Sequence, residues 1–286
     1  MRYLSPHTIN EAVAALADSD GDVKILAGGT DLLVQLRAGM KAPGLMLDVK
    51  RLPELRSINV EKNCFHIGAA VSGAEMGEHE SLKGSWPGVV EAMELIGSTQ
   101  IQGRATPGGN LCNASPAADS VPAMVAAGAI CTVVGSEGSR DLAVEDVGIS
   151  PGQTSLGRDE FVVDFRLPER PPHSGDAYLR FIPRTEMDIA VVGAGVNVVL
   201  GDDGVCVDAR VSLGAVAPRV LLVPDAANEL IGRKLNDEVL EKLDAACRAA
   251  CRPIDDKRGT VEYRTQVSGV LARRAAVIAF ERAGEK

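Results

Sequence analysis

Two loops with paired glycines carry the residue types in this chain that are best suited to holding a ligand. They are Ala27-Gly28-Gly29-Thr30-Asp31 and Thr106-Pro107-Gly108-Gly109-Asn110. Paired glycines remove two consecutive Cβ atoms, so backbone N–H groups can approach a ligand closely and adopt positive φ without strain. Each loop alone is well explained as a turn. Two such loops far apart in the sequence indicate a long ligand held from two sides, and a dinucleotide with a pyrophosphate is the best candidate.

The elements around the first loop show how its backbone would meet a phosphate. Residues 23–27 and 44–49 read as buried strands, and Asp31 is placed to cap a helix over residues 32–37. A strand–loop–helix–strand unit favours parallel pairing of its strands. The positive end of the helix and the N–H groups of the turn would face the phosphate. Because the loop contains no Lys or Arg, we expect backbone dipoles to balance the negative charge.

The chain from about residue 55 to residue 170 mixes short strands with helices. The predicted strands cover residues 64–69, 130–134 and 161–167. Residues 87–96 form a helix with one apolar face. The segment 100–122 is rich in Gly, Pro, Asn and Ser and is interpreted as irregular, which in a compact domain usually indicates function. Within it, Asp119 lies close to the start of the next helix, and helix capping alone would explain it.

Beyond a proline-rich boundary at residues 168–172, strands are followed by helices, an order typical of an α+β domain. The predicted strands cover residues 177–182, 189–200 and 205–216, and the predicted helices cover residues 236–250 and 261–280. Val191-Val-Gly-Ala-Gly195 resembles the start of a Rossmann fingerprint. The third glycine is missing and β-branched residues follow, so we interpret this segment as a strand.

Composition argues against several classes of function. The 286 residues carry a net charge of −9 without a clustered basic stripe, which disfavours nucleic acid and anionic membranes as partners. No stretch reaches the roughly 18 to 20 apolar residues that span a bilayer, and no secretory signal opens the chain, so we expect a cytoplasmic protein. The six cysteines form no Cys-x-x-Cys pair and the four histidines show no metal-binding spacing, so we predict no metal site.

Further motifs follow in a fixed order along essentially the whole chain. They are Leu26-Ala-Gly-Gly-Thr-Asp31, the segment from Ile96 to Leu111, Asn113-Ala-Ser-Pro-Ala-Ala-Asp-Ser-Val-Pro122, Tyr178-x-Arg180-x-x-x-Arg184-x-x-x-Asp188-Ile189-Ala190, and Asp256-x-Arg258-Gly259-x-x-Glu262-Tyr263-Arg264. In combination they resemble the flavoprotein (medium) subunit of molybdenum hydroxylases, the family of aerobic carbon monoxide dehydrogenase and xanthine dehydrogenase.

The resemblance implies an α+β fold in three parts. Two α/β subdomains, residues 1–55 and 56–170, would form the FAD-binding fold of the vanillyl-alcohol oxidase and p-cresol methylhydroxylase type. Residues 175–286 would form a C-terminal flavoprotein domain with an antiparallel three-stranded sheet and helices.

The resemblance also implies which residues bind FAD, and it implies no catalytic side chain. The first loop would hold the pyrophosphate through Ile25, Leu26, Ala27, Gly28, Gly29, Thr30, Asp31 and Leu32. The second loop would lie against it through Thr106, Pro107, Gly108, Gly109 and Asn110. Asp119 would bind a polar part of the cofactor, Val162 and Arg180 would contact the flavin end, and Ile189 would lie over the ring. A Lys is common in the family where this chain has Arg180, and some relatives have an aromatic residue at Ile96.

By the same resemblance, the chain would be an electron-transfer subunit and an oxidoreductase. A large molybdenum-cofactor subunit would oxidise the substrate, and a small subunit would relay electrons through its [2Fe-2S] clusters. FAD on this chain would then reduce NAD, a quinone, a carrier protein or oxygen, in a dimer of heterotrimers. Two alternatives are a self-contained FAD-dependent oxidase or reductase of the same fold, and a nucleotide-binding protein without enzymatic activity.

Overall fold

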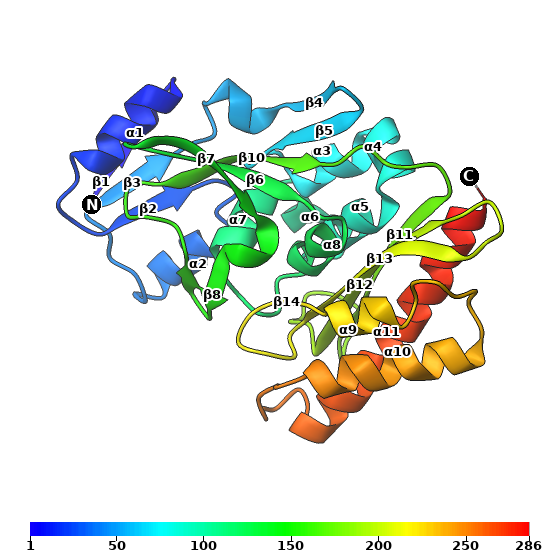
Figure 1. Cartoon of the computed structure of the whole chain (residues 1–286). Coiled ribbons are helices and arrows are strands. Elements are labelled where there is room, and N and C mark those ends of the chain that lie inside the picture. The colour runs from blue at the N-terminus through cyan, green and yellow to red at the C-terminus, as the bar shows by residue number, and fades with distance from the viewer. Residues whose placement is uncertain (286) are drawn as a thin grey trace.

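Parallel strands near the N-terminus form the first sheet in the computed structural model, which describes residues 1–285 (Figure 1). The strand order is β1 (Arg2–Leu4), β3 (Leu45–Asp48) and β2 (Val23–Leu26), with α1 (Ile9–Ala17) and α2 (Leu32–Arg37) as connections. Both strand pairings are parallel, which confirms the predicted strand–helix–strand unit. The register places Leu26 beside Asp48, so the first glycine loop leaves the sheet at the carboxyl end of β2.

An antiparallel five-stranded sheet forms the second layer. Its order is β4 (Ile58–Glu61), β5 (Cys64–Gly68), β10 (Phe161–Leu167), β6 (Ile130–Gly135) and β7 (Gly138–Ala143). The helices of this part are α3 (Gly73–Glu78), α4 (Glu80–Ser85), α5 (Pro87–Glu94), α6 (Thr99–Gln102), α7 (Pro107–Cys112) and α8 (Ser120–Ala126). Sheet and helices share one core, in which Phe165, Met93 and Met124 are almost completely buried.

The segment 100–122 is more ordered than expected, because α7, the end of α6 and the start of α8 lie within it. α7 forms although its sequence contains two glycines. Thr106 accepts a hydrogen bond from the Gly109 N–H at 3.1 Å, and Pro107 occupies the first helical position. The predicted irregular segment was therefore wrong in part, and the reason is helix capping.

The C-terminal part contains a four-stranded antiparallel sheet in the order β11 (Ser174–Phe181), β12 (Val192–Leu200), β13 (Cys206–Gly214) and β14 (Leu221–Leu222). The prediction of three strands was wrong because β14 has only two residues, too few to show strand alternation. The Rossmann-like segment that begins at Val191 runs into β12, as interpreted. The helices that follow are α9 (Pro224–Asn228), α10 (Asp237–Ala250) and α11 (Val261–Gly284), and α11 packs along β11 and β12.

Helices α5 and α8 join the C-terminal sheet to the rest of the molecule. The Arg282 guanidinium of α11 pairs with Glu91 of α5 at 2.5 Å. Arg170 pairs with Asp176 at 2.6 Å and stands 4.5 Å from the centre of the Trp86 ring. Between β7 and β10 in the sequence lie the short strands β8 (Gly148–Ser150) and β9 (Gln153–Thr154), which pair with each other.

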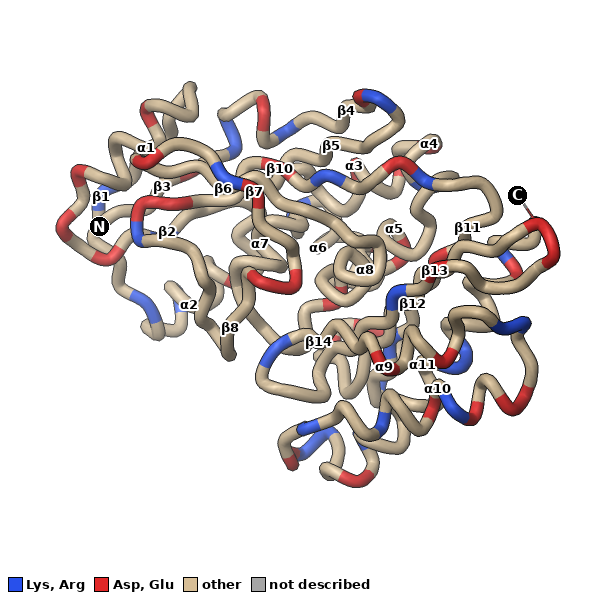
Figure 2. Tube along the Cα trace, viewed as in Figure 1, with Lys and Arg blue, Asp and Glu red and all other residues tan. Residues whose placement is uncertain are grey.

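Charged residues of both signs are interspersed along the trace (Figure 2). No extended basic face is seen in that view, which agrees with the composition. Over residues 1–285, none of the helices combines the length and the apolar character needed to cross a bilayer.

Candidate functional site

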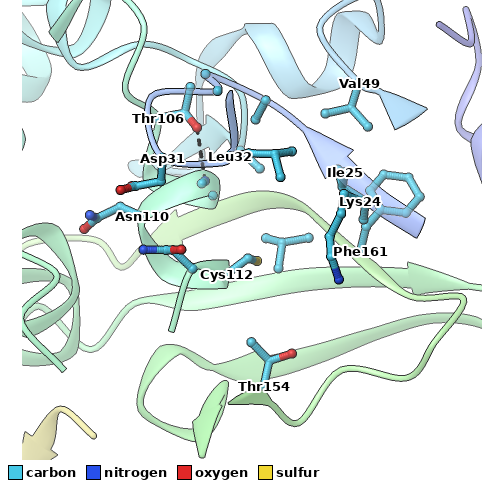
Figure 3. A pocket seen from close by; sticks show the side chains of 18 of the residues that line it. Lys24, Ile25, Asp31, Leu32, Val49, Thr106, Asn110, Cys112, Thr154 and Phe161 are labelled. Atoms are coloured by element: carbon cyan, nitrogen blue, oxygen red, sulfur yellow. Dashed lines mark hydrogen bonds between the residues drawn. The ribbon is translucent and has the colours of Figure 1, made fainter. Parts of the chain in front are cut away.

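A cleft of about 770 Å³ opens between the first sheet and the five-stranded sheet (Figure 3). Its volume lies within the range of roughly 300 to 1,000 Å³ that is usual for ligand and cofactor sites. In the close-up, Lys24, Ile25 and Phe161 lie on one side, and Asp31 and Asn110 lie on the other. The predicted site residues that line the cleft are Ile25, Ala27, Gly28, Gly29, Thr30, Asp31, Leu32, Thr106, Gly108, Gly109, Asn110 and Val162.

The first glycine loop presents a row of unpaired backbone donors. Within residues 1–285, the N–H groups from Gly28 to Leu32 have no hydrogen-bond partner in the protein. Gly29 has φ +82°, a conformation that favours glycine, and its carbonyl accepts from the Leu33 N–H at 3.0 Å. Consecutive N–H groups in such a turn form a concave site for anions. The first loop therefore fits a diphosphate.

Asp31 occupies the position before α2 but does not cap it, since its carboxylate makes no hydrogen bond to the helix. The expected capping role was therefore wrong. Burial raises the pKa of the Asp31 carboxyl above its usual range, because the surrounding protein removes water from the charged form. The side chain lies in the wall of the cleft, where an acceptor or a protonated carboxyl can face a ligand hydroxyl.

The second glycine loop uses its backbone donors within the protein. The Gly108 N–H donates to the Ala69 carbonyl at 3.0 Å, the Gly109 N–H to Thr106 Oγ1, and the Asn110 N–H to the Thr106 carbonyl at 2.9 Å. The expectation that N–H groups of both loops are free for a ligand is therefore wrong for these three. The second loop offers the Asn110 side chain to the cleft, and Asn113 at the end of α7 also lines it.

Two of the loop glycines are required by contacts within the chain. A Cβ atom at Gly28 would lie 1.9 Å from the Arg104 carbonyl oxygen, and one at Gly108 would lie 2.6 Å from the Ala69 carbonyl oxygen. Both distances are far below van der Waals contact, so a side chain at either position requires the backbone to move. At Gly28 this means that the segment before the second loop packs directly onto the first.

Three cationic side chains line the same cleft: Lys24, Lys41 and Arg158. The Lys24 ammonium is 2.8 Å from Asp22, and Arg158 donates to the carbonyl oxygens of Ser19 and Gly21. The expectation that backbone dipoles balance a bound anion rested on the loop alone, and the fold adds these cations to the wall of the cleft. These cations were missed because they lie outside the loop motifs and reach the cleft only through the fold.

Five predicted site residues do not line the cleft. Leu26 and Pro107 are buried behind the loops, and the Ile189 residue is 52% exposed. Asp119 and Arg180 form a buried pair, with 2.9 Å between carboxylate and guanidinium. The Tyr178 hydroxyl donates to the other carboxylate oxygen at 2.9 Å. Burial raises the pKa of Asp119 to about 6, although Arg180 and Tyr178 act in the opposite direction.

The remaining titratable groups of the cleft are suited to holding a ligand and poorly suited to acid–base chemistry. Cys112 is an exposed residue in the wall of the cleft, and desolvation by the neighbouring protein raises the pKa of its thiol, which favours the protonated form at neutral pH. Glu160 is bound by the Arg140 guanidinium through two contacts of 2.8 Å, which hold the pKa of its carboxyl below the usual range. Neither group is poised to exchange a proton near pH 7.

A long cleft with a row of free N–H groups, cations on its walls and no poised acid–base pair in the described lining defines a protein that binds a nucleotide cofactor. Comparison with known families agrees with this class. Residues 1–170 match the FAD binding domain in molybdopterin dehydrogenase, and residues 177–278 match the CO dehydrogenase flavoprotein C-terminal domain. The chain therefore belongs to the family of FAD-binding subunits of molybdopterin dehydrogenases, which are oxidoreductases with FAD as the cofactor of this subunit.

Individual relatives match over nearly their whole length. The carbon monoxide dehydrogenase medium chain of Afipia carboxidovorans is 32% identical, with 98% of this chain and 97% of the relative covered. The xanthine dehydrogenase FAD-binding subunit of Escherichia coli O157:H7 is 29% identical, with 99% and 97% covered. A carbon monoxide dehydrogenase structure from Hydrogenophaga pseudoflava superposes with a TM-score of 0.94 at 29% identity, covering 99% of this chain and 98% of that one.

Proposed function

We propose that this chain is the electron-transfer flavoprotein of a multi-subunit molybdenum-containing hydroxylase or dehydrogenase. It accepts electrons from [2Fe-2S] clusters of a small partner subunit and passes them to an external acceptor, which is NAD, a quinone, a carrier protein or oxygen. A large subunit holds the molybdenum cofactor. The observation that carries the proposal is the row of unpaired N–H groups from Gly28 to Leu32 in the wall of a cleft of dinucleotide size.

Different residues of the cleft would bind the diphosphate and the rings of FAD. The N–H groups of the first loop bind the diphosphate, with Lys24, Lys41 and Arg158 adding positive charge. Phe161, Val162 and Ile96 supply apolar surface for the rings. When bound, FAD supplies the ability to take up electrons singly and release them in pairs.

The buried pair of Asp119 and Arg180, together with Ile189, would act at the flavin end. The segment that contains Ile189 contacts residues next to the cleft. The neighbouring Met187 N–H donates to the Gly97 carbonyl at 3.4 Å, and Ile96 lines the cleft. Asp119 precedes Ser120, which holds Asn110 of the second loop. We propose that these residues contact FAD in the assembled complex.

Several finer assignments belong to the same proposal. Residues 1–55 and 56–170 are the two FAD-binding subdomains and residues 175–286 the C-terminal domain. The assembly is a dimer of heterotrimers located in the cytoplasm. A self-contained FAD oxidase is less well supported, because Cys112 stays protonated and Glu160 is bound by Arg140 in the cleft.

Purification with untagged partners tests the proposal. We expect a yellow complex with about one FAD per copy of this chain, with molybdenum and iron on co-purified subunits. Substrate of the molybdenum subunit should reduce the flavin in the complex, and the isolated chain should turn over no such substrate. A colourless chain that cannot be loaded with FAD would overturn the cofactor assignment, and substrate turnover by the isolated chain would overturn the subunit role.

A further inference from the structure

Asn110 joins the cleft to helix α8 in a way that fixes the orientation of its side-chain amide. Asn110 Oδ1 accepts from the Ser120 backbone N–H at 3.1 Å and from Ser120 Oγ at 2.7 Å. A backbone N–H can only donate, so the atom facing Ser120 must be the amide oxygen and not the nitrogen. The carboxamide therefore has one allowed orientation, and Ser120 sets it.

This contact also explains how α8 begins. Asp119 occupies the position before the helix, but its side chain makes no capping hydrogen bond. The first backbone donor of α8 is satisfied by Asn110, which comes from another helix. Ser120 is fully buried, so neither of its hydrogen bonds to Asn110 competes with solvent.

The amide nitrogen of Asn110 remains available to donate a hydrogen bond to a ligand. Within the described chain, Nδ2 makes no hydrogen bond, and it is not among the polar atoms enclosed by protein. Asn110 lines the cleft beside the row of free N–H groups, and it lies on the same side of the close-up as Asp31 (Figure 3). An oriented NH₂ group in a ligand cleft is a donor for an oxygen acceptor.

We propose that Ser120 is a positioning residue that directs the Asn110 NH₂ group toward an oxygen of the bound dinucleotide. This inference rests on the proposed FAD site. Ser120 does not line the cleft and acts only through Asn110. The amide thereby caps α8 with its oxygen and binds the cofactor with its nitrogen.

Titration of the flavin-free full chain with FAD, followed by flavin fluorescence, tests this assignment. Asn110→Asp keeps an oxygen acceptor for Ser120 and removes the NH₂ donor. We expect the melting temperature of the flavin-free chain to be retained and the affinity for FAD to fall about 10- to 100-fold. Asn113→Asp is the matched control, because Asn113 also lines the cleft and receives the same charge. We expect at least about tenfold less effect for the control.

The double-mutant cycle separates positioning from a structural effect. Ser120→Ala should weaken FAD binding about 3- to 10-fold in the wild-type background and less than about twofold in the Asn110→Asp background. Ser268→Ala removes another fully buried serine, in α11, and should change stability without changing FAD affinity.

Each outcome of the cycle decides the inference. Equal losses for Asn110→Asp and Asn113→Asp would show a charge effect only. Additive effects of Ser120→Ala in the two backgrounds, or unchanged affinity in Asn110→Asp, would also overturn the inference and leave the FAD site intact. Failure of the wild-type chain to bind FAD would overturn the proposed function and this inference with it.

Discussion

The two glycine loops have similar sequences, yet their backbones act differently. From Gly28 to Leu32 the N–H groups are free, whereas those of Gly108, Gly109 and Asn110 are used inside the protein. The free N–H groups suit the first loop to an anion, whereas the second loop is held by its own hydrogen bonds and presents the Asn110 side chain to the cleft. The comparison teaches that a glycine pair does not identify a phosphate loop by itself. The hydrogen bonds of each N–H group distinguish the two roles.

The largest effect is expected at Gly28, where the two loops meet. Gly28→Ala places a Cβ atom 1.9 Å from the Arg104 carbonyl oxygen, so the backbone has to move. We expect a loss of about 3 kcal/mol in the free energy of unfolding, together with loss of bound FAD, by denaturant titration and flavin absorbance. Gly84→Ala in α4 is the control, because among residues 1–285 an added Cβ meets nothing within 4 Å beyond the neighbouring backbone of its own helix. Unchanged stability in Gly28→Ala would contradict the packing of the two loops.

The next effect concerns the buried pair of Asp119 and Arg180, outside both loops, and depends on pH. The folded-state pKa of Asp119 is raised to about 6, so the folded chain holds this proton more tightly than the unfolded chain. The protonated Asp119 carboxyl therefore contributes to the free energy of unfolding at low pH. This contribution is lost as the pH rises from about 4 through about 6. We expect the free energy of unfolding of wild type, relative to Asp119→Asn, to fall by about 3 kcal/mol over this window. A pH-independent difference between the two proteins would refute the buried, raised-pKa carboxyl.

Thr106→Ala tests the supporting role of the second loop directly. It removes the side-chain acceptor of the Gly109 N–H, which costs about 1 kcal/mol of stability. We expect the loss of FAD affinity, measured by FAD titration, to be no larger than the loss of stability of α7 explains. The melting temperature of the flavin-free chain measures that loss of stability. A large loss of FAD affinity at unchanged stability would place Thr106 in direct contact with the cofactor and remove the contrast between the loops.

The smallest effect on FAD affinity is expected for the cations that line the cleft, of which Lys41 is one. Lys41→Met should weaken FAD binding about threefold at low salt, with less difference at high salt and no change in melting temperature. Lys234→Met, at an exposed position outside the cleft, is the control. An unchanged affinity at low salt would mean that the backbone donors alone balance the diphosphate.

Local patterns predicted the elements well where they are long or capped. The strand over residues 161–167 and the parallel unit around β2 follow from apolar runs and loop chemistry. Helix α7 was missed although Thr106 and Pro107 form a start signal, because two glycines argued against a helix. β14 was missed because two residues carry no periodicity.

The candidate site was predicted only as far as contiguous motifs reach. Lys41 and Arg158 approach the loop through tertiary structure, and nothing in their local sequence marks them. The cap that Asn110 gives to α8 is likewise a contact between two helices. Such contacts depend on how helices and strands pack in three dimensions. The spacing of residues within a local motif does not reveal that packing.

The close fit of the Arg104 carbonyl against Gly28 has a consequence for biosynthesis. When the first loop leaves the ribosome, the segment that completes its surroundings has not yet been translated. The surroundings of the first loop are therefore complete only after the segment around Arg104 has been synthesised and has docked. We accordingly expect FAD to bind only after this segment is in place.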